Sequence, residues 1–99
     1  MVTRELTSMH KSKKGTLSEL TVSQDLIREG YDVFWNIEGS GPVDLVAVHK
    51  GTGNIRLIDV KSESHLKETG AKIRRYLTPT QKRIGVEIIE VDLNEHFDI

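Results

Sequence analysis

The sequence of 99 residues contains no cysteine, which excludes a disulfide framework and a thiolate metal site. It has no apolar run long enough to span a membrane, and nothing near its first residues resembles a secretory signal. Its four histidines are too far apart in the sequence to form a zinc set, and internal repeats and low-complexity tracts are absent. We therefore expect one cytoplasmic domain with a modest core and no association with membranes.

The sequence has no marked excess of positive or negative charge. Its net charge of −1 gives no overall indication of a nucleic-acid partner. The charges are nonetheless segregated along the chain. Basic residues predominate in residues 1–14 and 61–83, whereas residues 84–99 contain acidic residues and no Lys or Arg. Two interpretations stay open, a single positive face or an ordinary solvated surface.

Helix signals occur twice in the sequence. Residues 16–19 (TLSE) fit the capping-box pattern, and Gly30 is expected to end the helix that they open. Residues 78–81 (TPTQ) form a second helix start with proline at the first helical position, and Gly85 makes this helix short. Residues 1–14 are expected to form a short basic helix or a mobile arm.

Apolar, β-branched runs predict four strands, at residues 31–37, 42–49, 55–62 and 86–91. A polar turn containing glycine joins the second strand to the third as a hairpin. The polar segment 63–77 is expected to form a flexible loop or a partly helical excursion, and the acidic tail to pack back or form an edge. The order α-β-β-β-α-β predicts an α/β or α+β fold, a small mixed sheet with a central antiparallel hairpin flanked by helices. Phe34 and Trp35 in the first strand are interpreted as core residues or dimer contacts.

Two acidic residues, Asp44 and Asp59, occur at matching distances on either side of the turn at Gly51-Thr52. Facing residues of an antiparallel pair have numbers with a constant sum, so a turn centred there places Asp44 opposite Asp59. Lys61 follows Asp59 by two residues and projects from the same face. Two carboxylates about 5 Å apart at an effective dielectric constant of about 20 repel each other by roughly 3 kcal/mol. We infer that a cation lies between them, and a divalent metal is the natural candidate.

Glu19 is a third acidic candidate. On a helical wheel it falls on the same side as Val22 and Leu26, where a carboxylate is costly unless it is paired or bound to a cation. Two roles are open for it. Glu19 completes the capping box with Thr16, or it joins Asp44 and Asp59 in a site.

These residues together resemble the PD-(D/E)XK nuclease superfamily, and more narrowly its small members similar to the archaeal Holliday junction resolvases. The resemblance covers roughly residues 13–91. It begins with a basic-glycine-helix-glutamate opening at residues 13–20 and continues through the helix-end glycine and first strand at residues 29–33. Its core is the pair of segments 42–44 (PVD) and 59–62 (DVKS). Val43 separates the proline from the aspartate, so the PD dipeptide itself is absent, while Asp as the second acid is within the family's variation.

The resemblance implies a restriction-endonuclease-like nuclease domain in residues 15–99 and hydrolysis of phosphodiester bonds in DNA with Mg²⁺ or Mn²⁺. Asp44 and Asp59 would ligate the metal with help from the Val60 main-chain carbonyl, and Glu19 would touch it directly or through water. Lys61 would orient or activate the attacking water. The catalytic residues implied are therefore Glu19, Asp44, Asp59 and Lys61, with a surface ion pair to Asp59 as the alternative role of Lys61.

DNA is the expected partner, and a homodimer or larger oligomer is expected because so small a domain leaves little surface for reading bases. The residues expected to bind nucleic acid are Lys11, Lys13, Lys14, Ser62, Lys72, Arg74, Arg75 and Gln81. Ser62 binds a phosphate or only terminates its strand, and Gln81 is a site residue or the Gln of the second capping box. We expect a structure-selective endonuclease. The alternatives are a sequence-specific homing or restriction-type endonuclease and a non-catalytic nucleic-acid-binding module.

Overall fold

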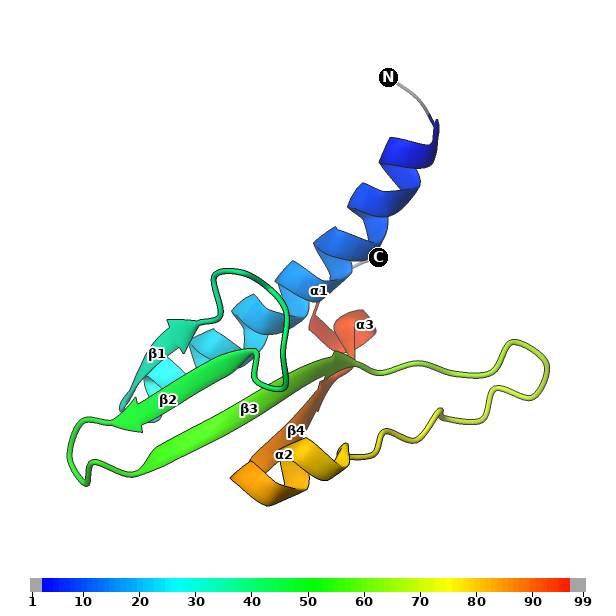
Figure 1. Cartoon of the computed structure of the whole chain (residues 1–99). Helices are drawn as coiled ribbons and strands as arrows, with labels where there is room; N and C mark the ends of the chain where they lie inside the picture. The colour runs from blue at the N-terminus through cyan, green and yellow to red at the C-terminus, as the bar shows by residue number, and fades with distance from the viewer. Residues whose placement is uncertain (1–2, 97–99) are drawn as a thin grey trace.

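The computed structural model describes residues 3–96, with side chains over residues 13–94, and has a small mixed α+β fold (Figure 1). The elements in chain order are α1 (Thr3–Arg28), β1 (Tyr31–Trp35), β2 (Leu45–His49), β3 (Ile55–Ser62), α2 (Pro79–Ile84), β4 (Val86–Val91) and α3 (Leu93–His96). The predicted series ended at the fourth strand and did not include α3. No helix in the described range combines the length and apolar character that crossing a bilayer requires.

The four strands form one mixed sheet in the order β1-β2-β3-β4. The β1–β2 and β2–β3 pairs are antiparallel, and the β3–β4 pair is parallel. A parallel pair requires a crossover, which the chain makes through residues 63–78 and α2. The predicted mixed sheet with a central antiparallel hairpin is thus confirmed.

The first helix is longer than expected. It runs without a break from Thr3 to Arg28, so the predicted start at Thr16 is wrong, and residues 3–14 are helical. Lys, Glu, Leu and Met before this point are strong helix formers, and a helix once nucleated gains one hydrogen bond per added residue, which carries it through Gly15 and Thr16. The helix ends before Gly30, as predicted, because Gly30 adopts a left-handed conformation with φ of 96°.

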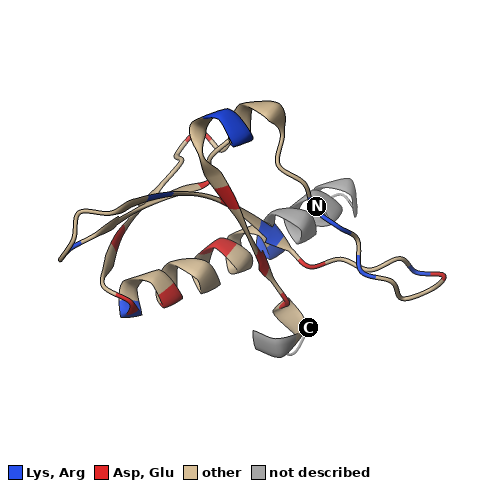
Figure 2. Ribbon diagram, turned by 90° about the horizontal axis from the view of Figure 1, so that it is seen from below, with Lys and Arg blue, Asp and Glu red and all other residues tan. Residues whose placement is uncertain are grey.

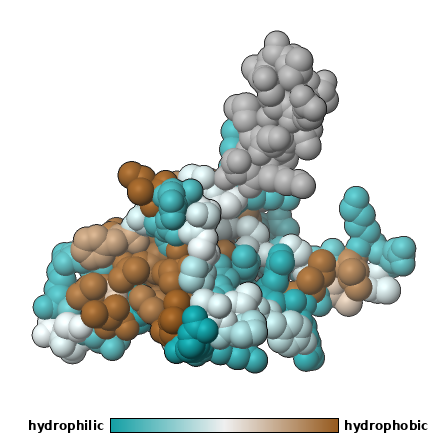
Figure 3. All heavy atoms as spheres, viewed as in Figure 1, coloured by the Kyte–Doolittle hydropathy of each residue, from teal (hydrophilic) through white to brown (hydrophobic). Residues whose placement is uncertain are grey.

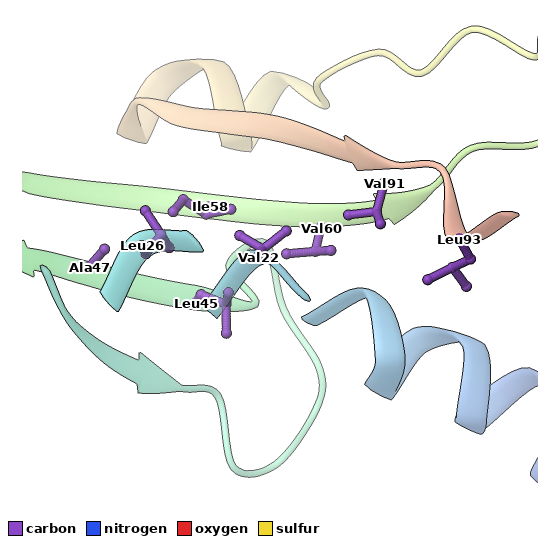
Figure 4. Close-up of a cluster of buried hydrophobic side chains, with 8 residues drawn as sticks. All are labelled: Val22, Leu26, Leu45, Ala47, Ile58, Val60, Val91 and Leu93. Carbon is purple, nitrogen blue, oxygen red and sulfur yellow. The ribbon is translucent and has the colours of Figure 1, made fainter. Parts of the chain in front are cut away.

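The core lies between α1 and one face of the sheet, and α2 lies on the other side of the sheet (Figure 2). Val22 and Leu26 of α1 meet alternate residues of the strands and Leu93 of α3, so the chain after β4 packs back towards α1. Figure 4 shows this cluster, which consists of Val22, Leu26, Leu45, Ala47, Ile58, Val60, Val91 and Leu93.

The second helix begins and ends as predicted. Thr78 is its N-cap in a complete capping box with Gln81, Pro79 is in its first turn, and Gly85 ends it in the left-handed conformation with φ of 82°. Because α2 is short, it covers only part of its side of the sheet, beside β4, and buries Val86.

The face of β1 to β3 opposite α1 carries uncovered apolar side chains (Figure 3). Phe34 is paired with Val46 in the sheet and is 57 % exposed, and Ile55 at the hairpin end is also exposed. Trp35 is 44 % exposed, and its indole Nε1 donates to Ser23 Oγ at 3.0 Å. The prediction of these residues as core residues is therefore wrong, because Phe34 lies on the face that α1 does not cover and Trp35 lies beside α1 at the open edge of β1. Their alternative role as dimer contacts stays a prediction.

Segment 63–77 extends away from the sheet as a narrow excursion between β3 and α2 (Figure 1). A bridge between His65 and Lys72 and a turn at Gly70, with φ of 74°, fold it back on itself. It contains no helix, so the partly helical alternative is wrong.

Candidate active site

The side chains of Asp44 and Asp59 interact, as expected, although the ladder pairs end at Leu45–Ile58 and do not include them. The pairs Leu45–Ile58 and Val48–Ile55 follow the expected register, and Asp44 lies one residue before β2. Its main-chain N–H donates to the Ile58 carbonyl at 2.8 Å, which continues the contact between the two segments. Because β2 begins only at Leu45, the Val60 N–H of β3 has no carbonyl partner from β2 and is instead bonded by the Asp44 side chain.

The Asp44 carboxylate is held in place by β3, but its surroundings disfavour its negatively charged form. Its Oδ2 accepts a hydrogen bond of 2.7 Å from the Val60 main-chain N–H. Burial raises the pKa of Asp44, and so do a hydrogen bond and charge repulsion with Asp59, against the opposing effects of Val60 N–H and Lys61. The two carboxyl groups therefore interact closely enough to disfavour two negative charges together.

Asp59 is the buried member of the pair, with only 6 % of its surface exposed. Its Oδ2 accepts a hydrogen bond of 3.1 Å from Gln81 Nε2, and its Oδ1 lies 3.6 Å from Lys61 Nζ. Lys61 projects from the same face of β3 as Asp59, as predicted, and is partly exposed. A buried carboxylate with one basic neighbour, one acidic neighbour and one amide donor differs from a solvated surface ion pair.

Gln81 completes the capping box, one of the two predicted roles, and its side chain also contacts the acidic pair. Its Oε1 accepts from the Thr78 main-chain N–H at 2.9 Å in the capping box. Its Nε2 donates to Asp59 Oδ2 and to the Pro42 carbonyl, the latter at 2.9 Å. The amide is buried and all its hydrogen-bonding groups are used within the protein, so Gln81 holds the carboxylate in place.

Glu19 lies near the pair but apart from it. Burial raises the pKa of Glu19, and the negative charge of Asp44 raises it further. The capping-box role is excluded because Glu19 is in the middle of α1. Among residues with described side chains, no group of three or more His, Cys, Asp or Glu is arranged to hold a metal ion, so Glu19 does not complete a closed carboxylate cluster.

Ser62 links the end of β3 to α1. Its hydroxyl is 2.7 Å from that of Ser18, which is almost completely buried, and its carbonyl accepts from Arg75 Nη2 at 3.3 Å. Arg75 also donates to Ser64 Oγ at 3.0 Å. Ser62 and Arg75 thus both have partners within the protein.

The other predicted DNA-binding residues lie on separate elements. Lys13 and Lys14 are exposed on α1, and Arg74 is exposed in segment 63–77, whereas the Lys11 side chain is outside the described range. Lys72 lies 3.3 Å from Glu63 and 3.5 Å from Glu90, and hydrogen bonding to Glu63 is the main cause that raises its pKa. Figure 2 shows Lys and Arg on α1, on α2 and between them, with Asp and Glu interspersed along α1 and β4.

A cleft of about 590 Å³ contains the acidic pair. Asp44, Asp59 and Lys61 line it together with two segments from outside the hairpin. These are residues 39–42 of the β1–β2 loop and a group from the start of α2, namely Tyr76, Thr78, Thr80 and Gln81. The sequence interpretation did not include Ser40, Tyr76, Thr78 or Thr80, and an aromatic residue two positions before a helix cap was the only signal available for Tyr76.

Comparisons with family models, with curated proteins and with solved structures yield no match for this chain. The chemistry of the cleft is therefore argued from its own residues. Two carboxylates on adjacent strands, an ammonium group and a buried amide that orients one carboxylate can hold a hard divalent cation and place a polar substrate beside it.

Proposed function

We propose that this chain is a divalent-metal-dependent DNA endonuclease with a PD-(D/E)XK, restriction-endonuclease-like core. The observation that carries the proposal is the meeting of Asp44, Asp59 and Lys61 in one cleft, where the two carboxylates interact directly and their like charges repel. A fold gains nothing from two interacting carboxylates unless a positive partner is bound there. Burial is the largest cause of the raised pKa of Asp44, and Asp59 raises it further while Lys61 lowers it, so a bound cation would stabilise the pair.

The donor set fits Mg²⁺ or Mn²⁺, which take oxygen ligands and keep several water molecules. Asp44 and Asp59 would supply one carboxylate each. The Val60 N–H points to Asp44, and the N–H and carbonyl of one strand residue point to the same edge, so the Val60 carbonyl is directed to that side as well. Two carboxylates and a carbonyl do not require a third acidic ligand, and Glu19 would act through water.

The bound ion supplies a water of lowered pKa and offsets charge on the phosphate. The protein's part is to orient the groups around the scissile bond. Each carboxylate uses its Oδ2 for an internal hydrogen bond, Asp44 to Val60 N–H and Asp59 to Gln81. Asp59 Oδ1 lies 3.6 Å from Lys61 Nζ, so the ion that the pair would hold would share this oxygen with Lys61. Lys61, held by Asp59 and partly exposed in the cleft, orients the attacking water and stabilises the negative charge that develops on the phosphate.

Structure-selective cleavage, similar to that of junction resolvases, is the specificity that we propose. Sequence-specific cleavage requires many contacts with base edges, and for this purpose the cleft offers only the hydroxyl groups of Ser40, Tyr76, Thr78 and Thr80 and the amine of Lys61. The expected homodimer or larger oligomer stays a prediction, and the mass in solution by light scattering tests it directly.

The test is a cleavage assay at low salt with Mg²⁺ or Mn²⁺ on linear duplex, single strand, flap and four-way junction. The variants are Asp59→Ala and Lys61→Ala, with Asp32→Asn as the matched control, because Asp32 is an exposed strand carboxylate paired only with Lys50. We expect cleavage to be lost in the first two variants and kept in the control.

Each rival has its own outcome in this assay. Cleavage of duplex at one sequence would favour a homing or restriction-type enzyme. DNA binding that is independent of metal, with no cleavage of any substrate, would contradict the enzyme and favour a binding module.

A further inference from the structure

Tyr76 is an exposed aromatic residue in the cleft that contains the acidic pair. Its side chain lines the cleft together with Asp44, Asp59 and Lys61, yet it is 76 % exposed. The hydrophobic core does not include it, and it lies in the extended segment just before the Thr78 cap of α2. Its ring is therefore available to a molecule that enters the cleft.

The second segment of the cleft leaves space beside the ring. Gly39 and Gly41 adopt left-handed φ values of 74° and 98°, and a Cβ added to either would meet nothing within 4 Å. With Ser40 between them, they line the cleft without a bulky side chain. Figure 1 shows the β1–β2 loop and the segment before α2 on the two sides of β3. A flat group of the size of a nucleobase is thus not blocked by side chains of this loop.

The charged residues of the cleft indicate that a base bound there would carry a phosphate. Lys61 is the one basic residue among those that line it, and the carboxylates repel anions until a cation is bound. A phosphate is therefore drawn to the metal position, while the neighbouring lining is an aromatic ring and hydroxyl groups. This combination of a phosphate position beside an aromatic platform is the arrangement used for unpaired nucleotides.

Continuous duplex does not offer this contact, because both faces of each base are covered by its neighbours in the stack. A side chain reaches a base face only where the base is unpaired or splayed out. Substrates with such a base beside the scissile phosphate include single strands, flaps and the branch points of junctions.

We propose that Tyr76 is a stacking platform for an unpaired nucleobase next to the scissile phosphate, so that the cleft takes single-stranded or branched DNA in preference to continuous duplex. This inference rests on the proposed nuclease function, because it uses the same cleft. Tyr76 is a specificity residue in this scheme and takes no part in the transfer of protons.

The test compares Tyr76→Phe, which keeps the ring, with Tyr76→Leu, which removes it and keeps apolar volume. Both changes are made in the full chain carrying Lys61→Ala, so that binding with Mg²⁺ is measured without cleavage. The probes are a single strand, a flap and a duplex of one sequence, each with 2-aminopurine at the unpaired or equivalent position. Thermal unfolding of both variants establishes that they are folded, as the exposure of Tyr76 leads us to expect.

We expect Tyr76→Leu to weaken binding of the single strand and flap on the order of 10-fold and to leave duplex binding within about twofold. Tyr76→Phe should bind all three as the parent does, and the quenching of 2-aminopurine on binding should be lost only in the leucine variant. Equal weakening on duplex and single strand, or no weakening at all, would overturn the proposal.

The two proposals fail separately. If the unmodified chain cleaves DNA and Tyr76→Leu does not change its preference, the stacking platform is wrong and the nuclease stands. If the unmodified chain cleaves nothing but Tyr76→Leu selectively loses the single strand, the nuclease and the scissile phosphate are wrong, and the cleft is a binding site for unpaired DNA with Tyr76 as its platform.

Discussion

Gln81 Nε2 donates a hydrogen bond of 3.1 Å to Asp59 Oδ2, and this contact ties the buried carboxylate to the first turn of α2. The same amide donates to the Pro42 carbonyl, two residues before Asp44. One side chain thus orients a proposed metal ligand, holds the segment that leads to the other, and completes a helix cap. The geometry of the acidic pair and the stability of α2 are therefore coupled.

Replacement of Gln81 should disturb both at once. Gln81→Met keeps the side-chain length but removes the partners of Asp59 Oδ2, the Pro42 carbonyl and the Thr78 N–H. We expect the free energy of unfolding to fall by about 1–3 kcal/mol, because buried polar groups are left unpaired. We also expect half-maximal cleavage to require at least about tenfold more Mg²⁺, because the carboxylate is no longer held in place. A tenfold change corresponds to a loss of about 1.4 kcal/mol in the free energy of Mg²⁺ binding.

Thr78→Ala separates the cap from the site. It removes only the bond from Gln81 N–H to Thr78 Oγ1 and should cost about 1 kcal/mol of unfolding free energy. The contact between Gln81 and Asp59 remains, so the Mg²⁺ requirement should not rise. An equal rise in both variants would show that α2 stability, and not the amide contact, controls the carboxylate.

The raised pKa of Asp44 makes a prediction about stability and pH without metal. The folded chain binds the Asp44 proton more tightly than the unfolded chain, so the contribution of Asp44 to stability should be fully present below the ordinary aspartate pKa of about 4 and decline as pH rises through the raised pKa. Glu19, whose pKa is also raised, acts in the same direction. Unfolding in denaturant with a chelator, measured from pH 3 to 8, should show this decline.

Asp44→Asn should flatten that decline and raise the Tm at neutral pH in chelator, because it removes one of two interacting negative charges. The same change should abolish cleavage and the stabilisation by Mg²⁺. Asp32→Asn, at an exposed carboxylate, is the control and should leave the pH profile as it is. A lower Tm for Asp44→Asn at neutral pH would show that its bond from Val60 outweighs the repulsion.

The hairpin and the short helix are the elements that the sequence predicted best. Both are determined by local signals. Turn residues fix the register of β2 and β3, which brings Asp44 near Asp59, and the cap residues Thr78 and Gln81 fix the start of α2. The acidic pair followed from this register alone, without knowledge of what packs around it.

The start of α1 and the walls of the cleft were missed for a different reason. A capping box at Thr16 is a local preference, and it competes with the gain from continuing a helix that has already formed upstream. Tyr76 reaches the cleft because the chain returns from a long excursion between β3 and α2, and such a return has no local signal. In both cases the structure at one position depends on residues outside its local sequence, which local signals do not report.

Salt dependence tests the expected contacts with phosphate. A basic residue that contacts one phosphate contributes about 0.9 to the slope of log K against log salt concentration. We expect Arg74→Ala, at an exposed position, to reduce the slope for flap DNA by about 1. Lys50→Ala is the control, because Lys50 lies at the hairpin turn and pairs with Asp32 at 3.4 Å. Equal slopes for all three proteins would exclude Arg74 as a phosphate contact.

Two glycines test the continuous first helix. Gly15 lies inside α1 with open space around it, so Gly15→Ala should raise the free energy of unfolding by about 0.5–1 kcal/mol if residues on both sides are helical. Gly30→Ala is the opposite case, because Gly30 has φ of 96° and an added Cβ would lie 3.2 Å from His49 Nε2. It should lower the free energy of unfolding by about 1 kcal/mol or more. Chemical denaturation with circular dichroism measures both, and a loss of stability in Gly15→Ala would mean that the helix begins after Gly15, as the capping box at Thr16 had suggested.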